Sequence, residues 1–120
     1  MNWLVGWSMV LAAFVSGAGI GLFFYRDDFL GGYGSFRRRI LRLGHIALAA
    51  LGLMNVVFSQ SPVAGDSAYR PAAIGLVVGG LTMPAVCFLS AWRPAFRHLF
   101  FVPVTALILA VVEILRGGAP

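Results

Sequence analysis

Four apolar runs constrain this chain more than any other feature. They cover roughly residues 3–25, 37–58, 71–92 and 96–116. Each run has about the 20 residues that an α-helix needs to cross the ~30 Å hydrocarbon core of a bilayer. Because lipid offers the backbone no hydrogen-bond partners, each run must be helical within a membrane. The sequence therefore predicts four membrane-spanning helices.

The composition leaves no room for a separate aqueous domain. Of the 120 residues, 60% are hydrophobic and only 11% are charged, whereas a soluble domain averages about 25% charged residues. The segments between the runs are short, so consecutive helices are expected to lie antiparallel. We therefore predict an all-α integral membrane protein, a single transmembrane domain over residues 1–120 folded as an antiparallel bundle of four helices. The first run is predicted to be a retained span, because it has no basic segment before it and no small-residue cleavage site after it.

The arginines predict the orientation of this bundle. Seven of the nine lie in or next to the first and third joining segments: Arg26, Arg37, Arg38, Arg39, Arg42, Arg93 and Arg97. Only Arg70 and Arg116 lie toward the opposite end. Because arginine and lysine are enriched in cytoplasmic loops, we expect both of these segments in the cytoplasm and both termini on the outer side.

The same arginines form a predicted basic face. Its members are Arg37, Arg38, Arg39, Arg42, Arg93 and Arg97. The second and fourth helices both begin at this end, so their positive dipole ends point to the same membrane surface. Such a face suits anionic lipid phosphates or an acidic partner. A role in setting topology alone would also account for the arginines. Nucleic-acid binding is not expected, because the net charge of +5 gathers at the ends of apolar runs.

A polar stripe follows one face of the second helix. Arg38, Arg42 and His45 share a narrow arc with small residues, and Asn55 lies at the edge of that arc. A polar stripe within lipid must face protein, water or a ligand. The simplest interpretation is that His45 makes a hydrogen bond to a neighbouring helix.

A second interpretation gives His45 a ligand. Together with His98, it would bind haem b or a quinone in a redox membrane subunit. Depth argues against a shared iron. His45 lies ~9 Å along its helix from Arg39, whereas His98 directly follows Arg97, at 1.5 Å per helical residue.

Glycine pairs at a spacing of four mark two helices. Gly17 and Gly21 lie in the first run, and Gly75 and Gly79 lie in the third. Small residues at this spacing let helix backbones approach closely in membranes. They predict helix packing, either inside the bundle or against another protein.

The chain contains no residue set that is typical of catalysis. It has no paired carboxylates, no Ser/His/Asp set, no phosphate-binding glycine loop and no metal-ligand spacing. Its one cysteine, Cys87, excludes an internal disulfide. The only acid within an apolar run, Glu113, lies one turn from Arg116, where an ion pair explains it. We therefore expect no enzyme activity.

The expected function is that of an accessory or scaffold subunit in a larger membrane assembly or homo-oligomer, surrounded by anionic lipid. A redox subunit that uses His45 is the alternative, and a small transporter-like protein is a further one. The segment from Arg37 to Gly52, RRRILRLGHIALAALG, resembles segments of small bacterial membrane proteins. The resemblance implies no activity, and it agrees with an expected location in the bacterial inner (plasma) membrane.

Overall fold

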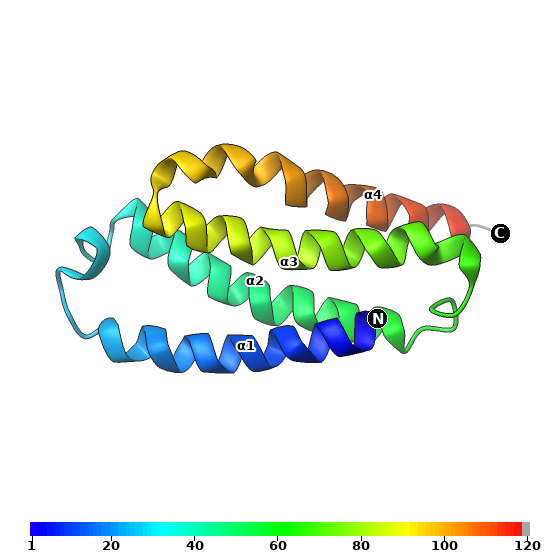
Figure 1. Cartoon of the computed structure of the whole chain (residues 1–120), viewed down its shortest axis with the longest axis horizontal. Coiled ribbons are helices and arrows are strands. Elements are labelled where there is room, and N and C mark those ends of the chain that lie inside the picture. Colours follow the sequence, from blue (N-terminus) through cyan, green and yellow to red (C-terminus); the bar gives the residue numbers. More distant parts are fainter. Residues whose placement is uncertain (119–120) are drawn as a thin grey trace.

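The computed structural model describes residues 1–118 and contains four long helices joined by short 3₁₀ segments (Figure 1). The helices are α1 (Asn2–Phe23), α2 (Phe36–Ser59), α3 (Arg70–Trp92) and α4 (Phe101–Gly118); the 3₁₀ segments are η1 (Phe29–Gly31), η2 (Ser67–Tyr69) and η3 (Pro94–Phe100). Each of the four helical stretches is long and apolar enough to cross a membrane. The prediction of four apolar helices is confirmed.

Consecutive helices run antiparallel, as predicted, and the two ends of the bundle differ in character. The N-terminus, the C-terminal end of α4 and the α2–α3 connection lie at one end, which we call the terminal end (Figure 1). The α1–α2 and α3–α4 connections lie at the other, which we call the arginine-rich end (Figure 1). Which end faces the cytoplasm stays a prediction from the arginines.

Helix α3 is the centre of the bundle. It packs extensively against α2 and α4 and touches α1, whereas α1 packs chiefly on α2 and α4 chiefly on α3. The bundle is therefore open and flat, with principal extents of 53 × 27 × 19 Å, and α1 and α4 lie at its two edges (Figure 1). Among the four helices, α3 has close neighbours on the most sides.

Two small apolar clusters hold α3 against its neighbours. Near the terminal end, Phe58 of α2, Leu76 of α3 and Ala110 of α4 are buried together. Toward the arginine-rich end, Ile40 of α2 packs with Cys87 of α3. The small side chains at these contacts let the helices approach closely, as is usual for helices in lipid.

The fourth helix begins later than predicted. Residues 94–100 form the 3₁₀ segment η3, and the α-helix starts at Phe101 instead of near residue 96. Pro103 explains the difference, because it has no N–H to donate to the carbonyl group of Leu99 and its ring would clash with that group in an α-helix. Pro103 lies in the first turn of α4 and not in the helix interior. Pro84, in contrast, lies within α3.

Candidate functional site

The arginine-rich end is built on the first turns of α2. Ser35 caps this helix, and its Oγ accepts a hydrogen bond from the backbone N–H of Arg38 at 3.2 Å. This cap satisfies one of the N–H groups that the first turn of a helix leaves without an internal partner. It also fixes where the run of arginines begins relative to the α1–α2 connection.

Arg38 is buried and acts as a cap for the neighbouring helix α1. Its side chain is only 1% exposed. The guanidinium donates hydrogen bonds to the carbonyl oxygen of Arg26, at 3.2 Å, and to that of Phe24. It also lies over the rings of Phe24 and Tyr33, 4.3 Å and 5.0 Å from their centroids. Its charge is thus held by carbonyl dipoles and aromatic faces at the C-terminal end of α1.

Arg37 does the same for α3. Its Nε donates to the carbonyl oxygen of Ala91, in the last turn of that helix, at 2.5 Å. The C-terminal end of a helix carries partial negative charge, and cations nearby are stabilising. An arginine is unfavourable at the start of its own helix, but Arg37 and Arg38 lie beside the C-terminal ends of two neighbours.

The other four members of the predicted basic face keep their charges available. Arg39 is exposed, and Arg42 is half-buried with its guanidinium 4.8 Å from the centroid of Tyr33. Arg93 lies over Trp92 at 4.9 Å, and Arg97 donates to the carbonyl oxygen of Pro94 at 3.3 Å. Of the seven arginines at this end, only Arg26 has a carboxylate within 4 Å in residues 1–118, that of Asp28 at 3.9 Å.

His45 faces α1 from within the apolar part of α2. Its Nδ1 lies 3.2 Å from Oγ of Ser16, so the interpretation of a hydrogen bond to a neighbouring helix is confirmed. The ring lies against Gly17, where an added Cβ would come within 2.7 Å of His45 Cε1. Gly17 therefore makes the space that the imidazole occupies.

The structure does not bring His45 and His98 together. His98 is exposed on η3, which packs mainly against α3, whereas His45 points to α1 on the other side of α2. In Figure 1, α3 runs between α2 and α4, and His98 lies in η3, just before α4 begins. Within one chain, therefore, these two residues do not form a common ligand set. The described residues contain no group of three or more His, Cys, Asp or Glu side chains that could hold a metal ion.

Asn55 belongs to a buried polar cluster that joins three helices at the terminal end. Its Oδ1 accepts a hydrogen bond from Nδ2 of Asn2 at 2.8 Å, and Asn2 also donates to the carbonyl oxygen of Ala73 at 3.0 Å. Nδ2 of Asn55 donates to the carbonyl oxygens of Leu51 and Leu76. Asn2 was not predicted as a partner of Asn55. A polar residue directly before the first apolar run could have indicated a hydrogen bond to another helix.

Of the four glycines predicted to pack, three contact a neighbouring helix and one does not. Gly75 lies against Ala110 of α4, where an added Cβ would come within 2.8 Å of the Ala110 side chain, and Gly79 lies against Leu107 of the same helix. Gly17 packs on His45. Gly21 has open space beside it, with nothing within 4 Å of an added Cβ. Of the GxxxG pair in α1, therefore, only Gly17 packs inside the bundle.

A different glycine pair, Gly6 and Gly52, lies where α1 crosses α2. An added Cβ at Gly6 would lie 2.6 Å from the carbonyl oxygen of Gly52, and one at Gly52 would lie 2.9 Å from that of Gly6. Here α1 and α2 touch backbone to backbone. Both glycines are visible in the sequence, but nothing along the chain indicated that these two residues meet.

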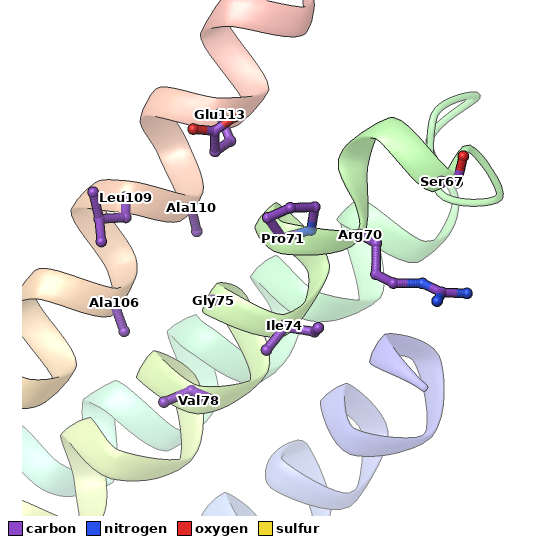
Figure 2. A pocket seen from close by; sticks show the side chains of 10 residues that line it. All are labelled: Ser67, Arg70, Pro71, Ile74, Gly75, Val78, Ala106, Leu109, Ala110 and Glu113. Carbon is purple, nitrogen blue, oxygen red and sulfur yellow. The ribbon is translucent and has the colours of Figure 1, made fainter.

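An apolar groove of about 680 Å³ runs between α3 and α4 toward the terminal end (Figure 2). Small residues such as Gly75 and Ala106 line it, and Arg70 and Glu113 lie near its mouth. Figure 2 shows the Arg70 side chain pointing away from α4. Glu113 instead pairs with Arg116 at 3.4 Å, as the spacing predicts.

The four apolar antiparallel helices define a small multi-pass membrane protein. Comparisons with protein-family models, with curated proteins and with solved structures found no match for this chain.

Proposed function

We propose that this protein is a non-catalytic membrane subunit that binds anionic lipid headgroups at its arginine-rich end and supports a larger membrane assembly. The observation that carries the proposal is the imbalance of charge at that end. Arg39, Arg93 and Arg97 are exposed, and within residues 1–118 none of them has a carboxylate within 4 Å. Exposed cations next to an anionic membrane surface attract its phosphates.

Aromatic side chains at the same end support a location in the headgroup layer. Trp92 stacks on Phe96 with ring centroids 6.4 Å apart, and Tyr33 lies under the guanidinium of Arg42. Tyrosine and tryptophan are enriched where hydrocarbon meets headgroups, because their rings are apolar and their N–H or O–H groups are polar. The arginine-rich end therefore combines exposed cations with aromatic rings of the kind that favour the headgroup layer.

The contacts of the half-buried Arg37 and the buried Arg38 sharpen the proposal. Both side chains donate to carbonyl groups at the ends of α1 and α3, so they serve the fold. The lipid-binding role then falls on the exposed arginines, Arg39, Arg93 and Arg97. This division also gives a test, because these three can be changed while Arg37 and Arg38 keep their contacts at the helix ends.

The test is native mass spectrometry of a triple variant, Arg39→Gln, Arg93→Gln and Arg97→Gln, extracted in mild detergent. Each arginine near an anionic surface contributes about 1 kcal/mol, so the affinity for acidic lipid should fall about a hundredfold. Arg26, Arg37, Arg38 and Arg42 remain to hold the topology. A double variant at the terminal end, Arg70→Gln with Arg116→Gln, is the matched control and should keep its acidic lipid. Equal lipid retention in both variants would contradict the proposal.

The open bundle supports the assembly part of the proposal. Helices α1 and α4 each have one main neighbour, and their outer faces are broad and apolar, with Leu11, Phe14, Ile108 and Leu115 all exposed. Cross-linking in native membranes, followed by extraction in mild detergent, tests this part. We expect recovery with a partner or as an oligomer, and recovery only as a monomer would count against it.

A further inference from the structure

A small polar pocket of about 220 Å³ lies at the terminal end of the bundle, between the start of α1, the α2–α3 connection and the start of α3. Its lining includes four polar residues, Asn2, Asp66, Ser67 and Arg70. A second pocket, of about 300 Å³, shares Asn2 with the first. Asn2 is therefore the buried polar residue that both pockets reach.

The side chain of Asn2 has one unused acceptor. It is only 6% exposed, and its Nδ2 uses both hydrogens, on Oδ1 of Asn55 and on the carbonyl oxygen of Ala73. Because a carbonyl oxygen can only accept, this contact fixes which branch of the amide is nitrogen and leaves Oδ1 as the other. Within residues 1–118, Oδ1 has no hydrogen-bond partner. Buried acceptors are normally paired, so the pocket favours a ligand that can donate a hydrogen bond.

Two opposite charges line the same pocket without pairing with each other. Arg70 is exposed and has no carboxylate within 4 Å in the described part of the chain, residues 1–118. Figure 2 shows its side chain pointing away from α4. Asp66 uses one carboxylate oxygen, Oδ1, to accept from the backbone N–H of Ala68 at 2.9 Å. The pocket therefore offers a carboxylate for a cation and a guanidinium for an anion.

The pocket lies at the level where the apolar helices begin and end. Two of the candidate membrane spans start at Asn2 and at Ser67, and another ends at Ser59, which lines the second pocket. Trp3, which is 52% exposed, also lines the second pocket. Tryptophan is enriched where hydrocarbon meets headgroups. This level suits a polar headgroup that carries both charges.

We propose that this pocket binds a phosphoethanolamine group, as carried by the lipid phosphatidylethanolamine. The primary ammonium donates to Oδ1 of Asn2 and pairs with the carboxylate of Asp66, and the phosphate pairs with Arg70. A choline headgroup carries the same phosphate, but its quaternary nitrogen has no hydrogen to donate and leaves the Asn2 oxygen unpaired. The ligand has no net charge and lies at the opposite end from the basic face, so the site is independent of acidic lipid binding there.

The test compares phosphatidylethanolamine with phosphatidylcholine of the same acyl chains, each titrated against the protein and followed by native mass spectrometry. We expect the ethanolamine lipid to bind about tenfold more tightly, the lower end of what a hydrogen bond to a charged group contributes. Asp66→Asn should reduce this preference, because the amide oxygen can still accept from the N–H of Ala68 but the charge is gone. Arg70→Gln should instead weaken both lipids alike, through the phosphate.

Arg116→Gln is the matched control variant. Arg116 lies at the same end but lines neither pocket, so its replacement should change neither affinity. Equal affinities of the unmodified protein for the two lipids would overturn the proposal. So would an unchanged preference in a folded Asp66→Asn variant, or undiminished binding of both lipids by Arg70→Gln.

A second titration distinguishes a lipid headgroup from the free group in water. Soluble phosphoethanolamine is added to the protein in nanodiscs made only of phosphatidylcholine. Binding that Asp66→Asn weakens would show that the group enters from water, and binding of the lipid alone would show that the acyl chains are required. Both results support the site, whereas binding of neither form would refute it.

Discussion

Arg38, in the first turn of α2, donates a hydrogen bond to the carbonyl oxygen of Phe24, the residue that follows the last turn of α1. The two helices are antiparallel neighbours, so the start of one lies beside the end of the other. A cation that opposes the dipole of its own helix is thereby placed against the negative end of another. Arg37 repeats the arrangement with Ala91 at the end of α3.

Removing Arg38 should destabilise the bundle. Arg38→Gln would leave the carbonyl groups of Phe24 and Arg26 without their charged donor, and hydrogen bonds to charged groups contribute about 1.5–3 kcal/mol. We expect a loss of about 2 kcal/mol in the free energy of unfolding, measured in detergent micelles. Arg39→Gln is the matched control, because Arg39 is the exposed neighbour and its loss should cost less than 0.5 kcal/mol, as for ordinary surface changes. Equal effects of both substitutions would show that Arg38 is no cap.

Gly6 should tolerate no side chain. Gly6→Ala places a Cβ 2.6 Å from the carbonyl oxygen of Gly52, a backbone atom that cannot move aside easily. Overpacking of this kind costs about 1–3 kcal/mol. Thermal unfolding should reveal it, with Gly21→Ala as the control, since Gly21 has open space and its replacement should be neutral or slightly stabilising. A neutral Gly6→Ala would mean that α1 and α2 do not cross here.

Asn2 and Asn55 should be energetically coupled. A double-mutant cycle with Asn2→Ala and Asn55→Ala isolates their 2.8 Å hydrogen bond. Interhelical hydrogen bonds in membrane proteins average about 0.6 kcal/mol and reach about 1.7 kcal/mol in such cycles, so we expect a coupling within that range. Strictly additive losses in the free energy of unfolding would show that the two side chains act separately.

The orientation can be checked by cysteine labelling. Cys87 is fully buried, and Cys87→Ala gives a background without thiols. Single cysteines are then introduced at Gly34, in the α1–α2 connection, and at Ser67, in the α2–α3 connection, both of which are exposed positions. The positive-inside rule predicts that a membrane-impermeant reagent labels the second site and not the first in intact cells. The reverse pattern would invert the topology.

The four helices and their antiparallel order could be predicted from composition and patterns along the chain. Long apolar stretches have one way to satisfy their backbone in lipid, and short connections turn each helix back beside the previous one. The charge distribution likewise marked the arginine-rich end. These features depend on local composition, and the later start of α4 also follows from a local cause, Pro103.

Which helix surfaces pack together could not be predicted in this way. In lipid, the face of a helix that packs and the face that contacts hydrocarbon are both apolar, so hydrophobic periodicity does not separate them. Gly17 and Gly21 share one motif, yet the first receives the His45 ring and the second faces open space. Arg38 and Arg39 are adjacent and chemically identical, yet only Arg38 lies beside the end of α1, because one position along a helix turns a side chain by about 100°.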